Sequence, residues 1–177
     1  MSMKKITALA LSLIMILCAV YAVAEGESKT EMGTLNVGQV FKIQCSLPEG
    51  YTYKPITKTE LNLVGILSAG EDKPSIYISI AYNEEYAGVE RLNDVDEAAL
   101  EEIRESFREV EEKVEFEDLE SAAGTRLLKV TAEDFVDIYT IYKSYELEFV
   151  LTGSNELTDA DVKMLVDFIS NMDFVAQ

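Results

Sequence analysis

The sequence predicts an α+β fold in which a mainly antiparallel sheet of about six strands is flanked by two main helices. Three alternating apolar runs follow one another within 125–152 with hairpin-length connections, as antiparallel strands do. Two other segments, 94–112 and 158–171, repeat apolar residues at three- and four-residue spacing, which is typical of amphipathic helices. Helices of this kind cover the faces of such a sheet, and the sequence therefore predicts a layered α/β sandwich.

The first 24 residues have the organisation of a signal peptide. Two lysines precede an apolar run, and the small residues Ala22-Val23-Ala24 form a cleavage site before Glu25. Two alternatives stay open: the run could be retained as a membrane anchor, or Cys18 could carry a lipid, although Leu17 is larger than a lipid site prefers. We expect an exported protein, periplasmic, extracellular or in the cell envelope, with no membrane insertion after cleavage.

The remainder is predicted as a flexible tether over 25–34 and a single domain over 35–177. The signal peptide removes two of the 15 basic residues and no acidic residue, which leaves 13 basic against 33 acidic residues and a net charge of −20. A domain this acidic lacks the positive surface that nucleic acid requires, so we expect no nucleic-acid partner. Cys45 is then the one remaining cysteine, which excludes an intramolecular disulfide, and its alternation with Phe41 and Ile43 indicates burial.

The first half of the domain is predicted to be strands joined by turns. Residues 51–58 contain Pro55 and are expected to be a loop, and residues 83–93 are expected to be a second loop. Alternating apolar residues predict strands at 40–47, 60–68 and 75–82, and 34–37 is compatible with a short edge strand.

In the second half, Asp94 is expected to cap the first helix, with Glu97 completing the cap. A strand at 113–118 and a turn at Gly124 lead into the three runs within 125–152. In the last of these runs, 145–151, the alternation places Glu146 and Glu148 on a half-exposed face. The turn before it, Lys143-Ser144, lacks the glycine or asparagine that two-residue hairpins prefer. Thr158 is expected to cap the closing helix.

This order resembles the PsbP-like family. Phe41-x-Ile43 followed by Leu47-Pro48-Glu49-Gly50-Tyr51 is similar to the opening of PsbP-like domains, and the middle helix, the Gly124 turn, the tyrosine-rich hairpin 136–151 and the Thr158-capped helix follow in the family's order. The fold is shared with an extrinsic photosystem II subunit and a Ran-binding nuclear import factor. The resemblance implies a binding module, generally without catalysis. It carries over no site residues, because fold does not supply function.

The composition excludes several kinds of catalytic site. The chain contains no histidine, so Ser–His and Cys–His catalysis and imidazole metal sites have no ligand or base. No glycine array matches a phosphate-binding loop. We therefore expect no enzyme activity and no cofactor. Carboxylate-based hydrolysis is the remaining catalytic hypothesis, because acidic residues are abundant.

The candidate partner-binding residues are tyrosines near strand ends and two aspartates. Residues 84–120 contain 16 acidic and four basic residues, a surface suited to a basic partner or a cation, although a solvated helix face explains them as well. Our main hypothesis is a monomeric, non-catalytic protein-binding module that contacts another protein of the envelope or exterior. The alternative is a small-ligand or calcium-binding protein that uses the loops 48–58 and 83–93 at one end of the sheet. The candidate residues are Tyr51, Tyr53, Tyr82, Tyr86, Asp94 and Asp96.

Overall fold

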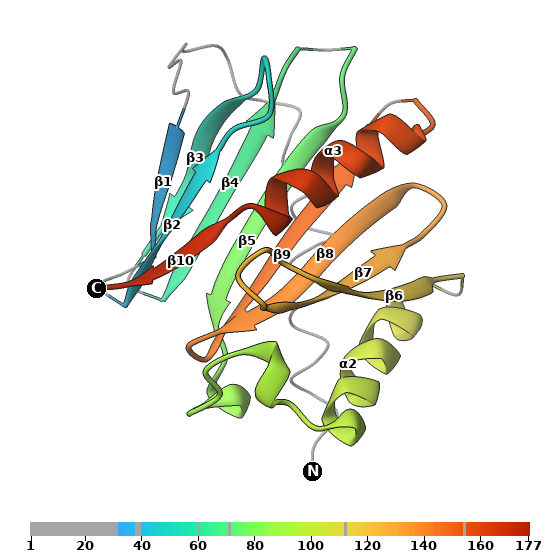
Figure 1. Ribbon diagram of the computed structural model, residues 1–177. Helices are drawn as coiled ribbons and strands as arrows, with labels where there is room; N and C mark the ends of the chain where they lie inside the picture. Colours follow the sequence, from blue (N-terminus) through green and yellow to red (C-terminus); the bar gives the residue numbers. More distant parts are fainter. Residues whose placement is uncertain (1–31, 38–39, 60, 71, 112, 154) are drawn as a thin grey trace.

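The computed structural model describes residues 32–177 apart from 38–39, 60, 71, 112 and 154, and its side chains from residue 40 onwards. It confirms the α+β fold with a mainly antiparallel sheet (Figure 1). The predicted signal peptide and most of the predicted tether lie outside the described residues. The large sheet has seven strands in the order β3-β4-β5-β9-β8-β7-β6, and all its neighbours are antiparallel. Their bounds are β3 Thr52–Lys58, β4 Asn62–Ser68, β5 Ser75–Tyr82, β6 Glu115–Glu120, β7 Arg126–Thr131, β8 Phe135–Tyr142 and β9 Tyr145–Thr152.

A second, three-stranded sheet was not predicted. It has the order β1-β2-β10, with bounds β1 Met32–Val37, β2 Phe41–Ser46 and β10 Asp173–Ala176. β1 begins inside the segment expected to be a tether, and β10 adds a strand after the last helix. The large sheet thus agrees with the predicted sheet of about six strands, and the described residues add the three-stranded sheet to it.

Four helical segments lie between the strands in the part of the chain that the structure describes. Two are short 3-10 helices: η1 (Glu84–Tyr86) lies inside the region 83–93 that was expected to be a loop, and η2 (Leu92–Asp94) lies at its end. The two α-helices are α2 (Glu97–Val110) and α3 (Asp159–Ser170), as predicted apart from their ends. Thr158 caps α3 in a reciprocal capping box with Asp161, which confirms that prediction. In the described part of the chain, no helix is both long and apolar enough to cross a membrane.

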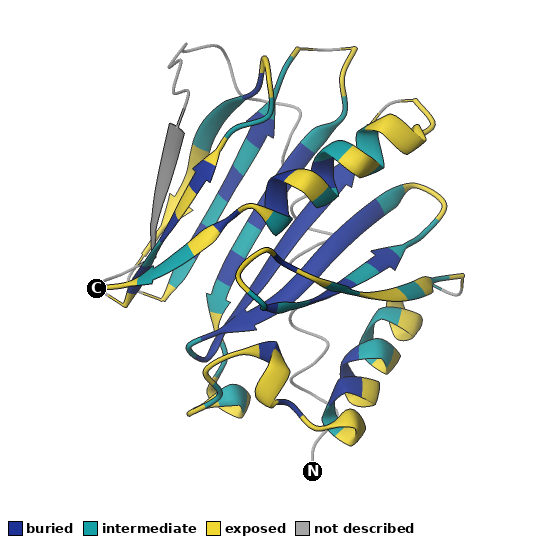
Figure 2. Ribbon diagram, viewed as in Figure 1, coloured by how far each residue is buried: buried dark blue, intermediate teal, exposed yellow. Residues whose placement is uncertain are grey.

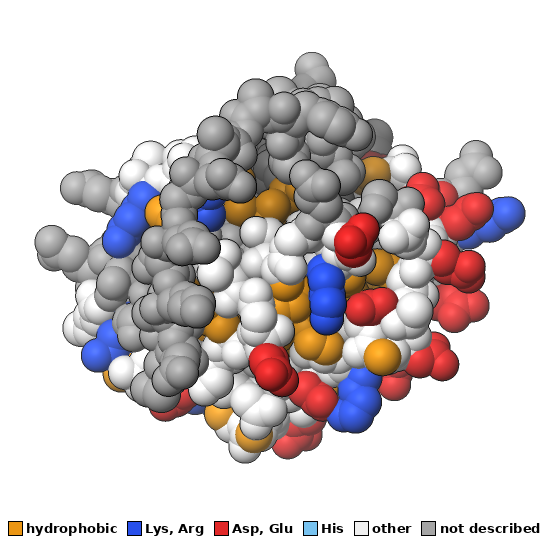
Figure 3. Space-filling view, turned by 90° about the horizontal axis from the view of Figure 1, so that it is seen from above, with side chains coloured by type: hydrophobic (Ala, Val, Ile, Leu, Met, Phe, Trp, Pro, Cys, Tyr) orange, Lys and Arg blue, Asp and Glu red, His pale blue; other side chains and the backbone are white. Residues whose placement is uncertain are grey.

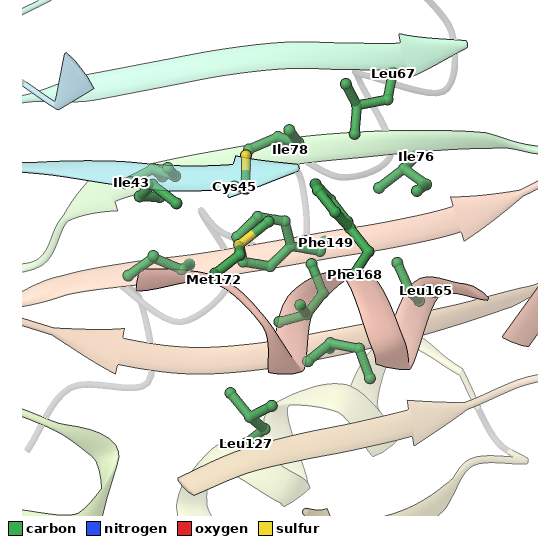
Figure 4. Close-up of a cluster of buried hydrophobic side chains, with 14 of the residues drawn as sticks. Ile43, Cys45, Leu67, Ile76, Ile78, Leu127, Phe149, Leu165, Phe168 and Met172 are labelled. Carbon is green, nitrogen blue, oxygen red and sulfur yellow. The ribbon is translucent and has the colours of Figure 1, made fainter. Parts of the chain in front are cut away.

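The two α-helices pack on opposite faces of the large sheet. Alternate residues of β8 belong to different cores: Val136 and Ile138 to one, Tyr139 and Ile141 to the other. The first core holds Leu165, Phe168 and Ile169 of α3 together with residues of the small sheet, as Figure 4 shows for Ile43 and Cys45 of β2. The second core holds Leu100 and Ile103 of α2. The central strands are thus covered on both faces, as their apolar composition predicts.

Burial follows this arrangement and corrects one prediction. β8 and β9 are buried almost throughout, whereas both α-helices expose their outer sides (Figure 2). The buried stretch includes Glu146 and Glu148, which the alternating pattern placed on a half-exposed face. The pattern identified the face correctly but not its burial in the assembled domain.

The β3 strand corrects a second prediction. Residues 52–58 pair with β4 although they contain Pro55, and the register shifts between Pro55 and Thr57. Proline is tolerated in an edge strand beside such an irregularity, because the missing N–H need not serve the ladder. Proline was the reason for predicting a loop there, and it marks the edge of the sheet instead.

Candidate functional site: a groove beside an acidic edge strand

The tyrosines predicted as partner-binding residues fall at two separate ends of the sheet. Tyr51 is buried, and its hydroxyl donates to the carbonyl of Pro74, just before the start of β5, at 2.8 Å. Tyr82 ends β5 and packs against Tyr145, with ring centroids 5.6 Å apart. The eight residues of β5 separate the two ends by about 25 Å. The small-ligand hypothesis expected the loops 48–58 and 83–93 at one end of the sheet. Residues 52–58 instead form the edge strand β3, and Tyr51 lies at the end of the sheet opposite Tyr82.

The side chains of Tyr53 and Tyr86 both pack against other residues of the domain. The ring of Tyr53 lies across Gly65, and its hydroxyl is buried with no hydrogen-bond partner among the described residues. Tyr86 packs against the α2-side core, where burial raises the pKa of its hydroxyl to about 12. Tyr82 is the candidate tyrosine that remains exposed, at 41%.

Asp94 and Asp96 act as helix caps. The carboxylate of Asp94 accepts from the Arg91 amide in the capping box of η2. The carboxylate of Asp96 accepts from the Ala99 amide at 2.9 Å and is the N-cap of α2. The predicted cap at Asp94 with Glu97 is thus wrong by two residues. Both aspartates are explained by local backbone geometry, which removes the reason to assign them to a cation.

Three buried carboxylates form a cluster that the sequence did not reveal. Glu146 accepts from the Tyr139 hydroxyl and the Asn83 amide, both at 2.9 Å. Asp137 is fully buried; its Oδ1 accepts from the Phe149 amide, and its Oδ2 has no hydrogen-bond partner among the described residues. Burial raises the pKa of Asp137 to about 7. Burial and the charge of Asp137 raise the pKa of Glu148 well above its usual value.

These carboxylates define an internal cluster without the features of a metal centre. Among the residues that the structure describes, no group of three or more Asp, Glu, Cys or His side chains is placed to hold a metal ion.

A groove of about 450 Å³ lies between α3 and the β6–β7 hairpin. Its apolar surface comes from both sides, from Leu119 on β6 and from Val162 and Val166 on α3. Two ion pairs flank it: Lys129 Nζ lies 2.8 Å from Glu117, and Lys163 Nζ lies 2.6 Å from Asp167. Figure 3, a view of the molecule from above, shows basic, acidic and hydrophobic side chains intermixed on the coloured part of the face that it draws. The full lining is Glu117, Leu119, Lys129, Thr131, Asp159, Val162, Lys163, Val166 and Asp167.

One wall of the groove is an edge strand of the large sheet. β6 pairs with β7 and with no other strand in the described part of the chain. Its sequence EFEDLE exposes four acidic side chains, whereas Phe116 and Leu119 are half-buried. An ion-pair network fixes β6 to α2: Arg126 Nε lies 2.8 Å from Asp118, and Arg104 bridges Asp118 and Glu97. The strand is therefore held in place while its outer edge faces away from the sheet.

Comparisons with family models, with curated proteins and with solved structures find no match to this chain. The PsbP-like resemblance stays a prediction from the order of the elements.

Proposed function

We propose that this protein is an exported, non-catalytic binding module, and that a partner protein binds in the groove between α3 and β6–β7. The groove itself is the observation that supports this function. Its volume of about 450 Å³ lies within the range of binding sites, and its lining combines apolar with charged side chains. It lies between a helix and two strands, one of which is the edge strand β6, and this arrangement suits an extended polypeptide segment.

The charges of the groove favour binding over chemistry. Lys129 and Lys163 each lie in an ion pair with a neighbouring carboxylate. Such ion pairs hold positive and negative charges at fixed positions in the groove, and a partner with complementary charges can recognise them. A catalytic acid or base instead needs a perturbed pKa and a reacting group within reach. The carboxylates with raised pKa values, Asp137, Glu146 and Glu148, are buried and are not among the residues that line the groove.

Site-specific crosslinking tests this proposal. A photoreactive phenylalanine analogue would replace Lys163 in the groove and, as a matched control, the exposed Lys58 on the opposite edge of the sheet. We expect irradiation of the producing cells to give a discrete protein adduct from position 163 and none from position 58. The same adducts from both positions, or no adduct from position 163, would contradict the proposal.

A further inference from the structure

The outer edge of β6 is a backbone surface that can accept another strand. One side of the strand is hydrogen-bonded to β7 in regular antiparallel register from Glu115 to Glu120. On the other side, the described residues provide no backbone hydrogen-bond partner. An edge of this kind presents N–H and C=O groups at every second residue, and these are the groups that strand addition uses.

The charges on β6 restrict what can pair with this edge. Within the described ion pairs, Glu117 is matched by Lys129 and Asp118 by two arginines. Glu115 and Glu120 are exposed and have no such ion pair among the described residues. Because side chains alternate along a strand, Glu115 lies on the same face as the groove residues Glu117 and Leu119, and Glu120 lies on the α2 face. Each face of β6 therefore retains one unmatched acid.

A second copy of this chain is a poor occupant for β6. Pairing β6 with itself would align four acidic side chains with another four, and directly opposed like charges destabilise a strand pair. The opposite edge, β3, carries Pro55 and a register shift, which make it an irregular template. A basic strand has neither obstacle, since its cations would lie opposite the unmatched acids.

We propose that an extended, basic peptide of the partner protein adds to the outer edge of β6 as a further strand of the large sheet, so that one face of the added strand borders the groove. This inference rests on the proposed function and adds the chemistry of the partner and its mode of binding. On the face toward α3, side chains of the added strand lie beside Leu119 at the open side of the groove, where apolar residues find an apolar neighbour. Lysine or arginine side chains at its ends reach Glu115 and Glu120.

A synthetic peptide tests the mode of binding directly. The probe is a peptide of about seven residues, the length of one strand, rich in valine and with a lysine near each end. The two lysines stand five residues apart, so that one points to each face of the sheet. Titration calorimetry with the whole protein should show binding that weakens between about 0.1 M and 1 M salt, where the Debye length falls from about 10 Å to 3 Å. Two N-methylated versions, modified at odd or at even positions, remove one set of backbone donors each. Because an added strand directs only one set toward β6, one version should bind and the other should not.

A pair of charge-reversed proteins tests the location. Glu115→Lys with Glu120→Lys removes the unmatched acids of β6, and Glu102→Lys with Glu109→Lys makes the same change in net charge on exposed positions of α2. We expect the β6 variant to lose affinity for the probe by about tenfold or more, and the α2 variant to stay within about twofold, because only the first set lies beside the added strand.

Three results would overturn the inference. They are no binding of the probe, equal binding of the two N-methylated versions, and equal losses in the two charge-reversed proteins. A crosslinked adduct at position 163 together with any of these results would leave the groove as a binding site and reject strand addition. Absence of the adduct would reject the proposed function itself.

Discussion

At the scale of single residues, Gly65 shows how closely β3 and β4 approach. A Cβ atom at this position would lie 2.5 Å from Cε2 of Tyr53, closer than any van der Waals contact allows. We expect Gly65→Ala to lower the free energy of unfolding by about 1–3 kcal/mol, because the Tyr53 ring must move out of a packed site. Urea unfolding followed by circular dichroism measures the change.

The same change in a Tyr53→Ala background provides the control. Once the ring is gone, the added methyl group has space, so the cost of Gly65→Ala should fall to about zero in a double-mutant cycle. Additive effects of the two substitutions would show that Tyr53 is not what requires a glycine at this position.

At the scale of elements, the β8–β9 turn holds two residues in a backbone conformation that they rarely adopt. Lys143 and Ser144 have φ values of 50° and 65°, as a two-residue hairpin turn requires, although neither is a glycine or asparagine. The preceding loop stabilises the turn: the Lys143 amide donates to the Glu90 carbonyl, and the Ser144 amide donates to the Val89 carbonyl, both at 2.9 Å. The Ser144 hydroxyl accepts from the Gly88 amide at 3.1 Å.

This geometry predicts that Lys143→Asn stabilises the protein. Asparagine tolerates the left-handed conformation, and the substitution keeps the amide that bonds Glu90, so we expect a gain of about 0.5–1 kcal/mol in the free energy of unfolding. Thermal and urea unfolding would measure it. Lys58→Asn removes the same charge at an exposed residue without a positive φ and should change stability by less than about 0.5 kcal/mol. A gain of equal size in the control would assign the effect to charge rather than to the turn.

The elements with strong local patterns were predictable from the sequence, and those that depend on their neighbours were not. The 125–152 strands and both α-helices have enough periodic residues to be recognised alone. β3 was missed because Pro55 argues against a strand unless the strand is known to lie at an edge. β10 has only four residues and is specified by its pairing with β2.

The site was less predictable than the fold, for a physical reason. The groove combines side chains from 117–131 and 159–167, and no local motif relates the two segments. The tyrosines near strand ends led the prediction to other parts of the sheet. An aromatic hydroxyl at such a place suits a partner contact and a buried hydrogen bond, such as that from Tyr51 to Pro74, equally well. The acidic content of 115–120 was visible in the sequence, but its place at the outer edge of the sheet was not.

At the scale of the whole molecule, the buried carboxylates predict stability that falls as pH rises. Burial raises the pKa of Asp137 from 3.8 to about 7, so the folded state keeps a proton that the unfolded state loses above about pH 4. The free energy of unfolding therefore falls progressively from pH 4 to about 7, by a total on the order of a few kcal/mol. Glu146 and Glu148 shift in the same direction. Because the chain has no histidine, no imidazole contributes to the change of the free energy of unfolding between pH 6 and 8.

Urea unfolding at pH 5, 6, 7 and 8 would measure this slope. Asp137→Asn keeps an oxygen for the Phe149 amide and removes the charge, so it should flatten the slope and raise stability at pH 8. Asp134→Asn, at an exposed position three residues earlier, should leave the slope unchanged. Stability that rises from pH 5 to 8, or an unchanged slope in Asp137→Asn, would contradict the assignment.

The two edges of the large sheet differ, and this difference limits how many strands can be added to the sheet. An added strand normally exposes a new edge on itself, and a sheet that can extend at both ends tends to polymerise. Here one end terminates in β3, where Pro55 and its register shift interrupt the ladder. Growth is therefore confined to the β6 end, and the charges there repel another β6. A sheet with one irregular edge and one charged edge is suited to a complex that ends after a single binding event.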